Sequence, residues 1–217
     1  MVDQLIKYSI IAPVYNEEET LTEFYNRVLS VMDSLDGLSE LLLIDDGSTD
    51  ASLDLMRGFQ QQTSLVRVIS FSRNFGHQVA ITAGIDYAIG DAVIVIDADL
   101  QDPPEVIPEL VAQWQEGFEL VLAVRSMRKG ESWFKRTTAS FFYRLINKLT
   151  DLHIPKDSGD FRLMDRKVVE ALREVREQHR FMRGLSVWVG FRHTQVEYVR
   201  NERFAGISKY PLKRMLN

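Results

Sequence analysis

Short apolar segments alternate with helical patterns through the first 124 residues of the chain. The apolar segments are rich in Val, Ile and Leu, which is typical of parallel strands that are buried on both faces. They are residues 8–14, 41–45, 65–71, 92–96 and 119–124. Helical patterns occupy about 17–35, 50–62, 76–89 and 104–115, with Asn16 as the expected N-cap of the first helix. This alternation predicts an α/β fold with a doubly wound, mostly parallel sheet and helices on both faces.

The second part of the chain has a different pattern. An amphipathic helix is expected over 132–150, a short strand over 161–164, helices over 166–178 and 181–191, and an edge strand over 193–199. Charge changes at the same place. Residues 1–124 hold 21 Asp and Glu against 5 Lys and Arg, whereas residues 125–217 hold 10 against 21. Such a division suggests that the second part meets an anionic partner: a nucleic acid, a phosphorylated substrate or a membrane.

Composition argues against a disulfide-rich or thiolate-metal protein and against a chain that spans a membrane. The chain has no Cys, so it has neither a disulfide framework nor a thiolate metal site. No apolar run approaches the roughly 18–20 residues that cross a bilayer, and residues 1–7 do not resemble a signal peptide. The 217 residues therefore predict one domain, or one domain with a small appendage, that faces a reducing compartment.

Two carboxylates follow the expected strand 92–96 directly. Asp97 and Asp99 stand one residue apart, and Pro103 and Pro104 then end the extended segment. Ligands of open α/β sheets bind beyond the carboxyl ends of the strands, and Mg²⁺ typically takes one or two carboxylates together with substrate phosphates. The motif therefore indicates a metal–phosphate site, although an acidic turn after a strand has the same residues.

Polar residues also follow the first two strands. Tyr15 could stack on a base, Glu17 could bind ribose hydroxyls or phosphate with the helix-start amides, and Asp46 offers an acceptor for base or ribose. Helix capping and turn formation explain the same residues equally well. The chain has no Gly-x-Gly-x-x-Gly after the first strand and no P-loop motif, which argues against dehydrogenases and P-loop NTPases.

Four motifs in order resemble glycosyltransferase family 2, an inverting family with the GT-A fold. The likeness covers essentially the whole chain and is greatest to the branch that uses polyprenyl phosphate, namely dolichol-phosphate mannose synthases and bacterial bactoprenol glucosyltransferases. The motifs are Pro13-Val14-Tyr15-Asn16-Glu17-Glu18, Asp45-Asp46-Gly47-Ser48-Thr49-Asp50, Asp97-Ala98-Asp99-Leu100-Gln101 and Ser158-Gly159-Asp160-Phe161-Arg162-Leu163.

The resemblance implies roles for individual residues. It assigns Mg²⁺ or Mn²⁺ to Asp97, Asp99 and Gln101, where the metal would stabilise the nucleoside diphosphate leaving group. The implied nucleotide-sugar contacts are Pro13, Tyr15, Glu17, Ile44, Asp46, Asp97 and Ala98, and the implied phosphate-binding residues are Arg125, Arg203 and Lys209. Residues 1–124 would then be the nucleotide and metal half of one GT-A catalytic domain, 125–200 the acceptor half and 201–217 a basic juxtamembrane segment.

Asp157 is the catalytic base that the resemblance implies, together with Asp99 at the metal. The second pKa of a phosphate monoester is about 6, so the acceptor is already largely ionised at neutral pH. Asp157 could therefore orient the sugar or the acceptor instead, and Asp160 is an alternative for the same role.

The expected reaction is the transfer of glucose from UDP-glucose to a polyprenyl phosphate at the cytoplasmic face of the membrane. Segments 158–166 and 181–185 are more similar to the glucosyl branch than to the mannose synthases, but a GDP-mannose-dependent enzyme or a saccharide acceptor stays open. The helix 132–150 and the tail 210–217 are the expected contacts with an anionic membrane. Relatives commonly carry transmembrane helices after the catalytic domain, so we expect either a piece of a longer protein or a peripheral enzyme. Aromatic residues at helical core spacing argue against nucleic acid, and a homo-oligomer stays open.

Overall fold

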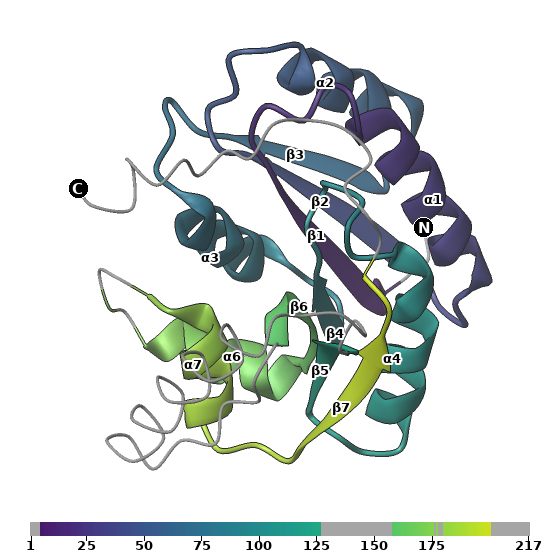
Figure 1. Cartoon of the computed structure of the whole chain (residues 1–217), viewed down its shortest axis with the longest axis vertical. Helices are drawn as coiled ribbons and strands as arrows, with labels where there is room; N and C mark the ends of the chain where they lie inside the picture. Colours follow the sequence, from purple (N-terminus) through teal and green to yellow (C-terminus); the bar gives the residue numbers. More distant parts are fainter. Residues whose placement is uncertain (1–4, 127–157, 176, 178–179, 201–217) are drawn as a thin grey trace, which may run out of the picture.

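The computed structural model describes residues 5–126, 158–175, 177 and 180–200. These residues form a seven-stranded sheet with helices on both faces (Figure 1). Its strands, in spatial order, are β3 (Val66–Ser70), β2 (Ser39–Asp45), β1 (Tyr8–Val14), β4 (Ala92–Val95), β6 (Ser158–Asp165), β5 (Leu120–Arg125) and β7 (His193–Tyr198). The helical elements are α1 (Leu21–Ser34), α2 (Ser52–Gln62), α3 (His77–Tyr87), the short 3₁₀ helix η1 (Pro104–Val106), α4 (Ile107–Gln115), α6 (Arg166–Glu174) and α7 (Met182–Trp188). The prediction of a mostly parallel α/β sheet is confirmed.

One strand runs against the others. β1 pairs in parallel with β2 and β4, β2 with β3, and β5 with β7, whereas β6 is antiparallel to both of its neighbours, β4 and β5. The carboxyl ends of six strands and the amino end of β6 therefore meet at the same edge of the sheet. The sequence predicted a strand at 161–164 but not that β6 would extend over eight residues and separate β4 from β5.

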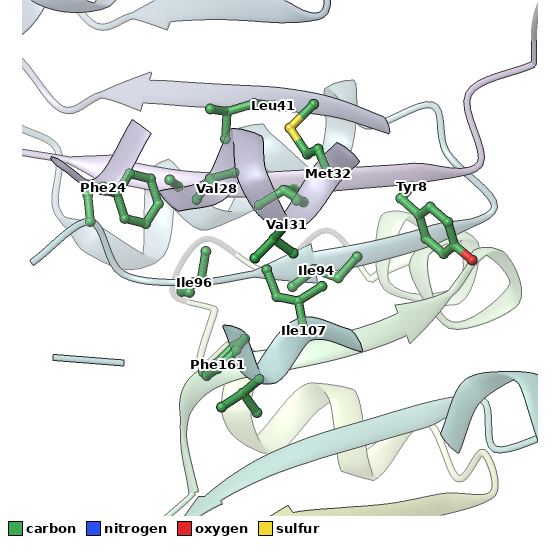
Figure 2. Close-up of a cluster of buried hydrophobic side chains, with 14 of the residues drawn as sticks. Tyr8, Phe24, Val28, Val31, Met32, Leu41, Ile94, Ile96, Ile107 and Phe161 are labelled. Carbon is green, nitrogen blue, oxygen red and sulfur yellow. The ribbon is translucent and has the colours of Figure 1, made fainter. Parts of the chain in front are cut away.

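Alternate residues of the strands supply two separate cores. Ile10, Leu41 and Ile94 face α1, α2 and α4, whereas Ile11, Leu42 and Val93 face α3, α6 and α7. Figure 2 shows the first core, in which Phe24, Val28 and Val31 of α1 lie with Ile94 and Ile96. Each large apolar side chain buried in this way contributes about 1.5–3 kcal/mol of transfer free energy, which holds both helical layers on the sheet.

The first helix begins later than the sequence predicted. Its N-cap is Thr20, so the prediction of Asn16 as the cap is wrong, and the three glutamates at 17–19 precede the helix. Asn16 has a positive φ of 54°, a conformation that Asn tolerates better than most residues. The segment after β1 is therefore a loop at the edge of the sheet.

Helix α3 lies very close to the sheet. A Cβ atom added at Gly84 would lie 2.2 Å from Cγ2 of Ile11 in β1, so only glycine allows this approach. The same packing fixes the start of α3, with His77 as its first residue, at the edge where the strands end.

Candidate functional site

The predicted metal-binding segment lies directly after β4. Asp97 and Asp99 are partly exposed, whereas Ala98, Leu100 and Gln101 between and after them are buried. Leu100 has a φ of 61°, which costs a residue other than glycine roughly 1–2 kcal/mol. Its side chain packs in the first core, and the Gln101 amide donates to Oδ1 of Asp99 at 3.1 Å. Core packing thus holds a strained turn that presents both carboxylates at the edge of the sheet.

Asp97 has an electrostatically unfavourable position. Burial raises the pKa of Asp97 to about 6, and the nearby carboxylates of Asp102, Asp160 and Asp99 act in the same direction, although His77 opposes them. Oδ1 of Asp97 is buried and has no hydrogen bond partner among the described residues, and it lies 3.4 Å from His77 Nε2. A cation at this oxygen would reduce the repulsion among the neighbouring carboxylates. It would also give the buried oxygen a partner.

These residues fit a divalent metal that is shared with a ligand. No group of three or more His, Cys, Asp or Glu arranged to hold a metal occurs among the described residues. Mg²⁺, however, needs only one or two carboxylates when phosphates and water complete its shell. Asp97 and Asp99 supply those carboxylates. Gln101 is 8% exposed, so a role for its side chain at the metal would be restricted to its accessible face.

The side of the site near β1 and β2 is built from carboxylates held by neutral donors. Oδ1 of Asp46 accepts hydrogen bonds from the amides of Phe75, at 2.7 Å, and Gly76, at 3.2 Å. Oδ1 of Asp45 accepts from the amide of Ser48, and its Oδ2 accepts from the hydroxyl of Ser70. We call Asp45 and Asp46 the amide-held pair. Both are buried, and they fix the β2 and β3 loops against each other.

Two neighbouring residues complete this side. Oδ1 of Asn16 accepts from the Thr49 amide at 2.7 Å, and the Asn16 amide donates to Oγ of Ser48. Gly47 has a φ of 70°, and a Cβ there would lie 2.4 Å from the carbonyl carbon of Arg73. The turn after β2 is therefore tied both to the β1 loop and to the β3 loop.

The predicted nucleotide contacts divide by exposure. Tyr15 and Glu17 are partly exposed in the loop after β1, and the Glu17 amide donates to Oγ of Ser52. Pro13 and Ile44 are buried in β1 and β2, side by side in register. The structure thus brings the predicted nucleotide residues to the ends of adjacent strands, where Tyr15 and Glu17 of the β1 loop are accessible, as is Asp97 after β4.

The side of the site near β5, β6 and β7 uses arginines instead. Asp102 is completely buried, accepts a hydrogen bond of 2.5 Å from the Tyr198 hydroxyl, and lies 3.5 Å from Nη2 of Arg125 and 3.3 Å from Nε of Arg200. Arg125 was predicted to bind phosphate and ends β5, where 30% of its side chain is exposed. Burial and the neighbouring Asp102 raise the pKa of Tyr198 far above its usual value, so the phenol keeps its proton.

Asp160, at the start of β6, is held in the same way. Nε and Nη2 of Arg183 donate to its two carboxylate oxygens at 2.9 and 2.7 Å, and His77 Nε2 lies 3.2 Å from Oδ2. Although burial opposes it, the hydrogen bonds from His77 and Arg183 hold the pKa of Asp160 well below its usual range. We call Asp102 and Asp160 the arginine-held pair. Asp160, predicted as an alternative to Asp157, is thus a buried and firmly paired anion.

Three predicted site residues lie outside the described residues: Asp157, Arg203 and Lys209, as do the expected helix 132–150 and the tail 210–217. Within the part of the chain that the structure describes, no helix is long and apolar enough to cross a membrane.

Sequence reasoning missed His77, Arg183, Asp102 and Tyr198. The distances in sequence explain why: Asp160 meets His77 across 83 residues, and Tyr198 meets Asp102 across 96. Asp102 alone had a local signal, since it follows Gln101 of the metal motif directly.

A model of glycosyl transferase family 2 matches residues 9–173. The chain is 56% identical over 211 residues to the uncharacterized glycosyltransferase YkcC of Bacillus subtilis, covering 97% of this chain and 65% of the relative. It is 47% identical over 205 residues to the bactoprenol glucosyl transferase of Shigella phage SfV, covering 94% of this chain and 67% of the relative. The chain thus spans about two thirds of the length of these curated relatives.

Solved structures share the fold at low sequence identity. A mannosyltransferase of Pyrobaculum calidifontis, in complex with GDP-Man and Mn²⁺, matches with a TM-score of 0.65 and 16% identity, covering 93% of this chain and 58% of that one. Glucosyl-3-phosphoglycerate synthase of Mycobacterium tuberculosis, in complex with Mn²⁺, UDP-Glc and phosphoglyceric acid, matches with a TM-score of 0.61 and 24% identity, covering 97% and 74%. These likenesses confirm the predicted GT-A-like sheet.

Proposed function

Because the chain belongs to glycosyltransferase family 2, we propose that it transfers glucose from UDP-glucose to a polyprenyl phosphate, with metal dependence and inversion at the anomeric carbon. The observation that carries the proposal is Asp97. Within the part of the chain that the structure describes, its buried Oδ1 has no hydrogen bond partner, and the residue lies near Asp99 just after β4, where a phosphate-bound cation would satisfy this oxygen. The 47% identity to a bactoprenol glucosyl transferase supports the sugar and the acceptor.

Asp97 and Asp99, with Gln101 beside them, are the residues that would hold Mg²⁺ or Mn²⁺. When bound, the metal would stabilise the negative charge on the departing nucleoside diphosphate. Without the metal the two carboxylates repel each other. Their role would therefore be to position the metal ion, not to donate a proton. Mn²⁺ in the structural neighbours supports this choice of metal.

Tyr15 and Glu17 would contact the base and the ribose from the loop after β1. Pro13, Ile44 and Ala98 would line the floor of the nucleotide site through backbone atoms, since their side chains are buried. Asp46 would act by shaping that floor, because its carboxylate already holds the amides of Phe75 and Gly76.

Arg125 would bind phosphate oxygens, and we assign Arg203 and Lys209 to the same task from the family resemblance. An acceptor phosphate oxygen would attack C1 of the sugar as the bond from C1 to the diphosphate oxygen breaks, which releases UDP. The acceptor is largely a dianion at neutral pH, so little proton transfer is needed. Asp157 would then orient the reactants or accept the remaining proton.

The acceptor is a lipid, so we place the reaction at the cytoplasmic face of the cell membrane. The excess of Lys and Arg after residue 124, 21 against 10 Asp and Glu, supports contact with an anionic surface.

Calorimetry with two donors tests the proposal. We expect UDP-glucose to bind with Mn²⁺, to lose most of its affinity in EDTA, and to bind more tightly than GDP-mannose. Transfer is then measured with radiolabelled UDP-glucose and a polyprenyl phosphate in detergent. Tighter binding of GDP-mannose would move the protein to the mannose synthases, and equal binding in EDTA would contradict the metal assignment.

A further inference from the structure

Asp102 connects the metal-binding segment to the predicted phosphate-binding arginine. It comes three residues after Asp99, and its side chain is completely buried. Its Oδ1 accepts a hydrogen bond from the hydroxyl of Tyr198, the last residue of β7. Its Oδ2 faces Nη2 of Arg125, the last residue of β5. One carboxylate thus contacts the ends of two strands that are far from it in sequence.

Arg125 is enclosed on several sides. The Tyr198 hydroxyl lies 3.3 Å from its Nε, and Asp102 lies 3.5 Å from its Nη2. A Cβ atom at Gly159 would lie 3.0 Å from Nη2, so β6 passes close to the guanidinium and a larger residue there would crowd it. These contacts fix a side chain that would otherwise have many rotamers, and they leave 30% of it exposed at the edge where phosphate is expected.

The contact between Asp102 and Arg125 is looser than an ordinary buried ion pair. Oδ2 of Asp102 is buried and makes no hydrogen bond to any described residue, because its distance of 3.5 Å to Nη2 of Arg125 is a charge contact only. Glu40, a buried acid in β2 at the opposite edge of the sheet, offers a contrast. Its carboxylate accepts a hydrogen bond of 2.6 Å from the Ser9 hydroxyl and one of 2.8 Å from Nη1 of Arg67. Arg67 donates a hydrogen bond to its acid, whereas within the described ranges the Arg125 side chain donates only from Nε, to Tyr198, so its Nη atoms keep donors for another partner.

We propose that Asp102 and Tyr198 are positioning residues that hold the Arg125 guanidinium for phosphate oxygens. The inference rests on the proposed function and deepens it, since it gives the phosphate site its support. The phosphate would belong either to the diphosphate of the donor or to the acceptor lipid. Asp102 also follows the metal motif directly in the sequence, so the predicted phosphate-binding arginine is oriented close to the metal carboxylates.

Direct binding measurements on the whole chain test the inference. Asp102→Asn keeps the shape of the side chain and removes its charge, and Tyr198→Phe removes only the hydroxyl. The probes are inorganic pyrophosphate with Mn²⁺, for the donor diphosphate, and farnesyl phosphate, for the acceptor. We expect Asp102→Asn to weaken one of the two probes by about tenfold and Tyr198→Phe to weaken the same probe by a few fold. The weakened probe identifies which phosphate Arg125 binds.

A matched control and a double variant separate positioning from stability. Glu40→Gln also removes a buried charge paired with an arginine and a hydroxyl, so it should lower the melting temperature without changing either affinity. If Asp102 acts through Arg125, Asp102→Asn should add little to the loss caused by Arg125→Ala. Additive losses, unchanged affinities in Asp102→Asn and Tyr198→Phe, or equal losses in Glu40→Gln would overturn the inference.

Turnover of UDP-glucose keeps the two proposals distinct. A wild-type chain that binds the phosphate probes but transfers no glucose would contradict the proposed function and leave the role of Asp102 standing. A wild-type chain that binds neither probe would overturn the inference itself.

Discussion

The two sides of the site hold their buried acids in different ways. The amide-held pair, Asp45 and Asp46, accepts hydrogen bonds from neutral groups, which are mostly backbone amides. The arginine-held pair, Asp102 and Asp160, is surrounded by Arg125, Arg200 and Arg183. Backbone donors are fixed by the fold and carry no net charge. Arginine donors bring a positive charge that can also face a phosphate.

This difference suggests that the two sides suit different parts of a nucleotide-sugar. The side near β1 and β2 has a rigid shape that suits the flat base and the ribose of a nucleotide. The side near β5, β6 and β7 has cations that suit phosphate groups. The chain is divided in the same way, because the acids dominate before residue 125 and the bases after it. The buried acids of the second side come partly from the first half, since Asp102 lies in the acidic half and pairs with arginines from the basic half.

Replacing one acid from each pair gives the largest expected effect. Asp160→Asn leaves the charges of Arg183 and of the buried Arg162 uncompensated, so we expect a loss of about 3–5 kcal/mol in the free energy of unfolding. Asp46→Asn leaves no uncompensated charge, because its partners are neutral backbone amides. The new side chain can still accept a hydrogen bond with its one oxygen, so the expected loss of unfolding free energy is about 1–2 kcal/mol. Urea denaturation of both variants measures the difference. Equal losses would show that the nature of the donors does not matter.

Acid titration sharpens the same test. The pKa of Asp160 is lowered in the folded chain, so its stabilising contribution is present above the pKa of an unfolded Asp, about 3.9, and is lost as the pH falls below that value. The wild-type chain should therefore lose stability between about pH 4 and pH 2 more steeply than Asp160→Asn does. Parallel curves would mean that Asp160 is not held as an anion.

Asp97 belongs to neither pair. Its replacement should have the second largest effect, on glucose transfer and not on stability. Asp97→Asn removes a charge that His77 offsets only in part and that burial and the neighbouring carboxylates oppose, so stability should stay the same or rise slightly while glucose transfer falls by at least about a hundredfold. Asp91→Asn, at the other end of the same strand, is a control in an exposed position. Isothermal titration of Mn²⁺ in the presence of UDP measures the lost metal site. Retained turnover would remove Asp97 from the metal assignment.

The sequence predicted one side of the site better than the other, for a physical reason. The strands, Asp97, Asp99 and the residues after β1 and β2 follow from local patterns, because parallel strands bring their carboxyl ends to one edge. The place of β6 between β4 and β5 does not follow, since an apolar strand pattern does not identify its neighbours. The contacts of Asp160 with His77 and Arg183 depend on that placement, so they could not be predicted either.

The error at Asn16 has a similar origin. An Asn before three glutamates is typical of a helix start, and the local pattern alone favours a cap. The Thr49 amide competes for the same side-chain oxygen, and it comes from a turn 33 residues away. The tertiary contact prevails, and the helix begins four residues later than the cap would have required, after Thr20.

That contact gives the smallest expected effect and tests the rigidity of the amide-held side. Asn16→Gly keeps the positive φ and loses the hydrogen bond from Thr49, so about 1 kcal/mol of stability should be lost. Asn16→Ala loses the same bond and adds the strain of a left-handed residue, about 1–2 kcal/mol more. Urea denaturation ranks the two variants, and a UDP titration measures binding. If the rigid loop shapes the nucleotide site, UDP affinity should fall in both variants while pyrophosphate affinity stays constant. A fall in both affinities would mean that the two sides of the site are not independent.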